Sequence, residues 1–285
     1  MSISLEKANQ LLASQSLPEE LMQKWQALTR ILAELGSVAV AYSGGVDSTL
    51  LAYASAIVLR EKSMAVFIDS EVETARQKYN AGRWAQQMGF AMFTLPYSPL
   101  SDPQFVVNPT RRCYYCKQHI LSAIREFAST HGFESIVEGQ NVDDLAVYRP
   151  GRQAVSETGT HSPLAEAGLT KAEIRALSKA LSLPVWDLPS TPCLATRFPY
   201  GSTITAEGLR RVEAAEEYLH SLGYDPVRVR IHENLARVEV SPHQFPQFME
   251  QVGLVTDHFS KLGFAHTTLD LKGFRSGSFD EGLSR

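Results

Sequence analysis

A short glycine turn between an apolar run and a helical pattern constrains this chain more than any other feature. The run Ser37–Tyr42 is apolar and β-prone, and it stops at Gly44 and Gly45. After the glycines, apolar residues recur at helical spacing as far as Val58. The predicted order is strand, turn, helix, which surrounds the turn with backbone N–H groups and the positive end of a helix dipole. The turn is therefore predicted to bind an anion such as phosphate.

Further segments extend this pattern into an α/β domain. Residues 64–68 and 135–137 have the composition of buried strands, and helix-like segments lie around residues 72–89 and 117–131. Strands that alternate with helices predict a parallel sheet. The fold class is therefore α/β.

A cluster of prolines indicates where this domain ends. Four of the 14 prolines fall in residues 184–199, where neither a helix nor a central strand is favoured. We expect residues 1–190 to form the parallel-sheet domain with its N-terminal helices. Residues 191–285 are expected to form a second, smaller α+β domain, with a helix over residues 205–222 followed by paired strands.

Composition narrows the class of protein. The 285 residues include 27 basic and 31 acidic side chains, so the strongly basic balance of a non-specific nucleic-acid binder is missing. No apolar run reaches the roughly 18 residues of a membrane helix, and Glu6 and Lys7 lie where a signal peptide needs apolar residues. We expect a soluble, cytoplasmic protein with a small-molecule partner, and neither nucleic acid nor membrane as a partner.

The turn itself, Ser43-Gly-Gly-Val-Asp-Ser48, resembles the PP-loop of the ATP pyrophosphatases. No lysine follows the glycines as in a Walker loop, and the glycines are adjacent, unlike those of the dinucleotide fingerprint. The resemblance implies an adenine nucleotide alpha hydrolase-like domain whose loop holds the β- and γ-phosphates of ATP. The simpler alternative is a glycine turn capped by serine. The candidate ATP-binding residues, with Asp47 also holding Mg²⁺, are Ser43, Gly44, Gly45, Asp47 and Ser48.

Two acidic residues lie at the ends of predicted strands. Asp69 follows the second strand, at the edge where α/β sheets bind ligands, and is either a nucleotide contact or a turn aspartate. Glu138 follows the strand at residues 135–137 and could orient a substrate or Mg²⁺, or simply cap a turn.

Three cysteines form the second candidate site. Cys113 and Cys116 make a CxxC, and Cys193 lies in the proline-rich segment. Four interpretations remain open: three thiolates that hold a [4Fe–4S] cluster, a structural zinc completed by His119, a dithiol that resolves a persulfide on Cys193, and inert thiols. Soft sulfur ligands favour the cluster. The basic neighbours that favour the thiolate form are Arg111, Arg112, Lys117 and Arg197.

Several more segments, together with the loop, resemble the LarE family of ATP-dependent sulfur transferases from about residue 20 to about residue 275. They are Glu138–Leu145, Tyr148–Gly151, Ser162–Leu164, Leu169–Arg175, Cys193–Arg197 and Val227–Arg230.

The resemblance implies a reaction and its cofactors. It implies that ATP adenylates the carboxylates of pyridinium-3,5-biscarboxylic acid mononucleotide, and that sulfur then replaces AMP, in the biosynthesis of the nickel-pincer cofactor of lactate racemase. Family members with only the cysteine matching Cys193 sacrifice it, whereas members with the CxxC resemble cluster-dependent enzymes. Because this chain has all three, a [4Fe–4S] cluster on Cys113, Cys116 and Cys193 is predicted. The resemblance also implies a homo-oligomer such as a hexamer and leaves the sulfur donor open.

Basic residues complete the predicted site. Lys117 and Arg197 are expected to balance developing negative charge. Arg228 and Arg230 share one face of an alternating strand and are expected to clamp the substrate phosphate, unless that face is merely solvated. The alternative function is a PP-loop tRNA thiolase of the 2-thiocytidine type. Three carboxylates on the predicted helix over residues 205–222 have a spacing that could present them to a metal, but a solvated acidic face is favoured: Glu213, Glu216 and Glu217.

Overall fold

The computed structural model describes residues 4–145 and 151–275, which fall into two compact units. The units interleave in the chain, because two short segments that precede residue 113 belong with the C-terminal part. The first unit is Met1–Ser70, Ala75–Tyr97 and Cys113–Thr191, and the second is Glu71–Thr74, Ser98–Arg112 and Pro192–Arg285. Of the motif Tyr148–Gly151, residues 148–150 lie outside the described residues.

The first unit contains a four-stranded parallel sheet, which confirms the predicted α/β class. Its strands are β1 (Val38–Tyr42), β2 (Ser63–Asp69), β3 (Met92–Pro96) and β4 (Ser135–Glu138), in the order β3-β2-β1-β4. Strand β3 is missing from the predicted strands. It lies at the sheet edge and is only partly buried, so it lacks the continuous apolar run of the inner strands.

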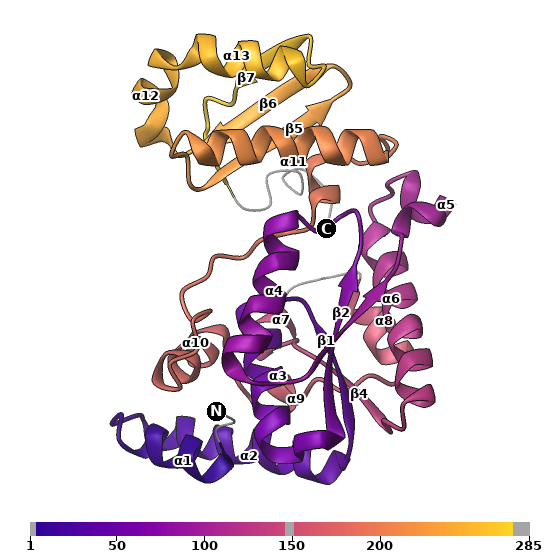
Figure 1. The fold of residues 1–285 in the computed structure, drawn as a ribbon, viewed down its shortest axis with the longest axis vertical. Helices are drawn as coiled ribbons and strands as arrows, with labels where there is room; N and C mark the ends of the chain where they lie inside the picture. The colour runs from indigo at the N-terminus through magenta and orange to yellow at the C-terminus, as the bar shows by residue number, and fades with distance from the viewer. Residues whose placement is uncertain (1–3, 146–150, 276–285) are drawn as a thin grey trace. The chain divides into compact units, whose positions relative to one another are not determined.

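Helices cover both faces of this sheet, and Figure 1 shows α4 and α6 on opposite sides of it. Alternate residues of β1 pack into separate cores: Val40 lies with α3 and α10, and Ala39 lies with α6. The helices of this unit are α1 (Leu5–Ala13), α2 (Glu19–Leu35), α3 (Val46–Leu59), α4 (Ala75–Met88), α6 (Arg112–Thr130), α7 (Val142–Leu145), α8 (Gly151–Glu157), α9 (Pro163–Glu166) and α10 (Lys171–Ala180).

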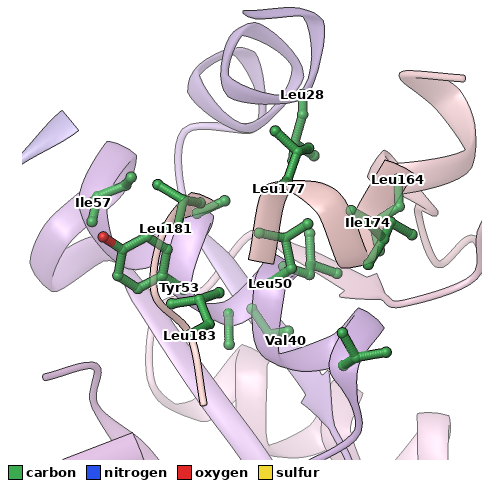
Figure 2. Close-up of a cluster of buried hydrophobic side chains, with 14 of the residues drawn as sticks. Leu28, Val40, Leu50, Tyr53, Ile57, Leu164, Ile174, Leu177, Leu181 and Leu183 are labelled. Carbon is green, nitrogen blue, oxygen red and sulfur yellow. The ribbon is translucent and has the colours of Figure 1, made fainter. Parts of the chain in front are cut away.

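The larger core surrounds α3, which is why that helix is apolar on nearly all sides. Figure 2 shows Leu50 and Tyr53 of α3 beside Leu177 and Leu181 of α10. Burying each such side chain stabilises the fold by about 1.5–3 kcal/mol. The core thus fixes the start of α3, and with it the glycine turn.

The second unit is α+β. Its three strands, β5 (Val227–His232), β6 (Leu235–Val240) and β7 (His266–Leu269), lie in that order, with β5 antiparallel and β7 parallel to β6. Its helices are α5 (Pro103–Val106), α11 (Ala206–Ser221), α12 (Phe245–Glu250) and α13 (Val252–Lys261). Within residues 4–145 and 151–275, no helix is long and apolar enough to cross a membrane.

Candidate functional site

The strand order of the first unit locates a ligand site. From β1 the chain passes to β2 and β3 on one side, and it then crosses to β4 on the other side of β1. The connections therefore diverge between β1 and β4, and open α/β sheets bind ligands at the carboxyl ends of strands at such a point. The glycine turn follows β1 there, Glu138 is the last residue of β4, and Gly139 comes directly after it.

The backbone of the turn suits an anion. Gly44 has a φ of +76°, a conformation that favours glycine, and a Cβ there would lie 3.3 Å from the Cβ of Ala81. Gly45 is the N-cap of α3 and provides no side-chain cap for the N–H groups of the first helical turn. The hydroxyls of Ser43 and Ser48 lie 3.0 Å apart and close the loop. Five predicted residues thus form one loop with its N–H groups at a helix start.

Gly139 packs directly on this loop. A Cβ added to Gly139 would lie 2.9 Å from the backbone nitrogen of Ser48 and 3.2 Å from its Cα. Only a residue without a side chain lets the end of β4 approach the first turn of α3 this closely.

We expect Gly139→Ala to lower the free energy of unfolding by about 1–3 kcal/mol, because the methyl group would displace the first turn of α3. Urea denaturation measures this change. The matched control is Gly253→Ala, since a Cβ at Gly253 in α13 meets nothing within 4 Å. Equal stability of the two variants would contradict the close packing described here.

Asp47 lies in the first turn of α3 and is paired with a lysine from α10. The Nζ of Lys171 lies 2.5 Å from Oδ2 of Asp47, and the side-chain amide of Asn141 donates to Oδ1 at 3.5 Å. Both charged side chains are partly exposed, at 35% for Lys171 and 23% for Asp47. This carboxylate is therefore partly accessible, and a cation that binds it more strongly than Lys171 can displace the lysine.

Helix α10 begins at Lys171, and Thr170 and Glu173 form a capping box at its start. Sequence reasoning gave Lys171 no role of its own. It missed Lys171 and Asn141 as partners of Asp47, because these residues are 124 and 94 positions away from it in the chain. The signal that was available is their position in the family-like segments 138–145 and 169–175.

Glu138 is a buried carboxylate with three donors. Its side chain is 8% exposed, and it accepts from Lys117 Nζ at 3.0 Å, Ser162 Oγ at 2.8 Å and the Gln140 backbone N–H at 3.1 Å. This cation and these hydrogen bonds hold the carboxylate at the end of β4. Asp69 differs, because its half-exposed carboxylate pairs with Lys78 of α4 at 2.5 Å.

The CxxC lies at the start of α6. That helix begins at Arg112, five residues before its predicted start, so Cys113 and Cys116 are three residues apart on one helical face. Cys113 is exposed and Cys116 partly exposed. Nδ1 of His119, the fourth ligand in the zinc interpretation, lies 3.1 Å from the Tyr97 hydroxyl.

Cys193 belongs to the second unit, where Arg197 holds its segment. Arg197 is 4% exposed and donates to Pro192 O at 2.8 Å and to Cys193 O at 3.2 Å. Two of its nitrogens also bind the two oxygens of Glu216, each at 2.9 Å. Burial acts to lower the pKa of Arg197, but Glu216, Cys193 and Glu239 together outweigh burial, so the pKa is raised. The predicted solvated acidic face is wrong for Glu216, which is 6% exposed because it pairs with this arginine.

Arg228 and Arg230 of β5 are 4% and 2% exposed, so the alternative of a solvated strand face is wrong. Arg230 binds Glu239 at 2.6 Å and donates to Thr196 O at 2.8 Å. Arg228 lies over the Phe274 ring at 4.7 Å, and its Nε has no hydrogen-bond partner among the described residues. Burial, followed by the charges of Arg197 and Arg230, lowers the pKa of Arg228 to about 10.

These two arginines therefore differ in what they can do. Arg230 is committed to Glu239 and to the backbone near Cys193. Arg228 is a buried cation whose Nε donor has no partner among the described residues, so it is the better candidate to bind an anionic ligand.

The three cysteines are divided between the units, Cys113 and Cys116 in the first and Cys193 in the second. In the part of the chain that the structure describes, no three His, Cys, Asp or Glu side chains are grouped so as to hold a metal ion.

Known proteins resemble this chain along most of its length, although no family model matches it. An uncharacterized protein of Synechocystis sp. is 41% identical over 267 residues, which is 93% of this chain and 100% of that protein. An uncharacterized protein of Methanocaldococcus jannaschii is 28% identical over 241 residues, covering 84% of this chain and 91% of its own.

A third relative carries a functional name. The pyridinium-3,5-bisthiocarboxylic acid mononucleotide synthase of Lactiplantibacillus plantarum is 36% identical over 266 residues, which is 93% of this chain and 96% of the synthase. The matched length of 266 residues is long enough to extend into both units. The chain belongs to the LarE family of sulfur transferases.

Proposed function

We propose that this protein uses ATP to adenylate, and then to thiolate, the carboxylates of pyridinium-3,5-biscarboxylic acid mononucleotide. The observation that carries the proposal is the Ser43–Ser48 loop at the point where the strand order reverses, in a chain 36% identical to a protein named for the bisthiocarboxylic product. A carboxylate oxygen is a poor leaving group, so its exchange for sulfur requires activation. A loop built for phosphates supports ATP as the activating reagent.

The proposed chemistry balances in two steps. A carboxylate oxygen attacks the α-phosphorus of ATP, the bond to the β-phosphate breaks, and pyrophosphate leaves. Sulfide then attacks the acyl carbon, the bond to the adenylate oxygen breaks, and AMP leaves together with one proton. Each thiocarboxylate therefore consumes one ATP and one sulfide.

In this proposal the loop and Asp47 act on the pyrophosphate side. The N–H groups at the start of α3 hold the leaving phosphates, and Asp47 binds the Mg²⁺ that accompanies them. Lys171, which pairs with Asp47 at 2.5 Å, would be released when Asp47 holds the metal and would supply a positive charge for the phosphates. Phosphoryl transfer depends on this kind of positioning and charge neutralisation.

Lys117 and Glu138 act near the substrate carboxylate. The buried Glu138 fixes Lys117 through their 3.0 Å contact, so the ammonium group is held at the carboxyl end of β4. A fixed cation stabilises negative charge as it develops during the reaction. Asp69 remains a candidate nucleotide contact on the same sheet edge.

Cys113, Cys116 and Cys193 would hold a [4Fe–4S] cluster. Two of the thiols share one helical face and are accessible to solvent, as ligands of a cluster must be before it is inserted. When bound, the cluster would supply a sulfide on its open iron. Arg197 holds the backbone of Cys193 and Pro192, and its role in balancing charge during transfer stays a prediction.

Arg228→Ala and Arg230→Ala should have different effects, the first on affinity for the substrate and the second on stability of the fold. Arg228→Ala should weaken affinity for the mononucleotide by about 1.5–3 kcal/mol, through loss of charge-assisted bonds to its phosphate. Arg230→Ala should instead destabilise the fold by about 3–5 kcal/mol, because it removes a partner of the fully buried Glu239. Calorimetric titration and urea denaturation measure the two effects. The reverse pattern would contradict the assignment of Arg228 to the substrate.

The function is tested by measuring the nucleotide products with each substrate class. Under anaerobic conditions, with a sulfide source, the mononucleotide should trigger release of AMP and pyrophosphate in equal amounts, and bulk tRNA should not. If ADP and inorganic phosphate were the main products, they would contradict the proposed adenylation step. Thiolation of tRNA with no response to the mononucleotide would establish the alternative function.

A further inference from the structure

The side chain of Arg112, the first residue of α6, contacts Asn108, Ala195 and Tyr200, which all belong to the second unit together with Cys193. Arg112 is 3% exposed, and its Nη1 donates to the carbonyl oxygen of Ala195 at 2.9 Å. The same nitrogen donates to the side-chain oxygen of Asn108. The guanidinium carbon also lies 5.4 Å from the centre of the Tyr200 ring.

Asn108 completes the connection. It is fully buried, and its φ of +54° is a left-handed conformation that asparagine adopts more readily than most residues. Its side-chain amide nitrogen donates to the backbone oxygen of Pro199 at 2.7 Å, and its backbone carbonyl oxygen accepts from the Gly201 N–H at 2.8 Å. Asn108 and Arg112 therefore bind backbone groups along a single segment, residues 195–201.

Arg112 is the residue immediately before Cys113, and Ala195 comes two residues after Cys193. Consecutive Cα atoms are about 3.8 Å apart, so anchoring Arg112 at Ala195 also restricts where the CxxC can begin. A buried, hydrogen-bonded guanidinium is a strong anchor, because breaking it leaves a charge or a carbonyl without a partner.

We infer that Arg112 is a positioning residue for the three-cysteine site, because it ties the start of the CxxC helix to the segment carrying Cys193. This assignment rests on the proposed function, in which the three thiols act together. Arg112 does not touch the reacting atoms in this assignment. It acts through the two backbone segments that it joins.

The test uses the full-length protein without cluster, ATP or substrate, in a Cys116→Ser background. A short bis-maleimide should cross-link Cys113 to Cys193, with the linked peptides identified by mass spectrometry. Arg112→Gln should lower the cross-linking yield roughly tenfold or more, as expected for loss of a buried, charge-assisted bond. Arg125→Gln is the matched control, because it removes the same charge from an exposed position on α6 and should leave the yield unchanged.

Thermal unfolding followed by circular dichroism checks that each variant is folded. If Arg112→Gln does not fold, Arg112→Lys is the deciding variant. It keeps the charge, but a shorter side chain with a tetrahedral ammonium group does not reproduce the planar guanidinium whose Nη1 binds both acceptors, so its yield should also fall. An unchanged yield in the folded variant, or no cross-link in the parent protein, would overturn the inference. A normal, Arg112-dependent cross-link in a protein that never transfers sulfur would instead contradict the proposed function alone.

Discussion

Replacing Asp47 with asparagine should reduce the rate of AMP and pyrophosphate formation roughly 10²–10³-fold, the loss typical when one preorganised electrostatic group is removed. Asparagine has the same shape but carries no charge, so it is a weaker ligand for Mg²⁺. The fold should persist, because the pair with Lys171 is partly exposed and contributes only about 0.2–1 kcal/mol. A radioactive pyrophosphate exchange assay measures the adenylation step directly.

Asp187→Asn is the matched control, since Asp187 is an exposed aspartate of the same unit. Its exchange rate should equal that of the parent protein. If Asp47→Asn retained the parent rate, the loop would not be the site of ATP activation.

The second large effect concerns the cysteines. Replacing Cys113, Cys116 or Cys193 by serine, one at a time, should abolish both iron binding and sulfur transfer, because two thiolates hold a cubane cluster poorly. The measurements are iron and acid-labile sulfide per chain after anaerobic purification, together with the yield of thiolated product.

A sacrificial mechanism predicts a different pattern. Only Cys193 would be indispensable, and after turnover the protein mass would fall by about 34 Da, the loss of H₂S as cysteine becomes dehydroalanine. A fully active anaerobic protein that contains zinc, or no metal, would contradict the cluster. These outcomes separate the interpretations of the three thiols that the sequence leaves open.

Local sequence signals were sufficient to predict the centre of the first unit. The apolar run before Gly44 and the helical spacing after it predicted β1 and α3, and the strands that contain Phe67 and Val137 were recognised by their apolar composition. Strand β3 was missed because an edge strand has no continuous apolar run. Helix α6 was predicted to begin too late, because the CxxC interrupts its apolar periodicity.

Partners that depend on the tertiary fold were not predictable from spacing. Lys171 looks like an ordinary helix start in the sequence, and only the fold brings it to Asp47. Glu216 looks like part of a solvated acidic face, and only the packing of α11 against β5 buries it with Arg197. Arg112 stands next to the cysteines in the sequence, yet its partner is a carbonyl 83 residues away. Long-range ion pairs and hydrogen bonds leave no periodic trace, whereas strands and helices do.

The central claim is that this protein exchanges carboxylate oxygen for sulfur at the expense of ATP, and the most direct test is the mass of the mononucleotide after reaction. The anaerobic protein should be given the mononucleotide, Mg²⁺, ATP and a ³⁴S-labelled sulfide source. The account predicts products in which one and then two oxygens are replaced by labelled sulfur, with one AMP released for each sulfur incorporated. Release of AMP without any labelled sulfur in the mononucleotide, or sulfur incorporation without ATP consumption, would contradict it.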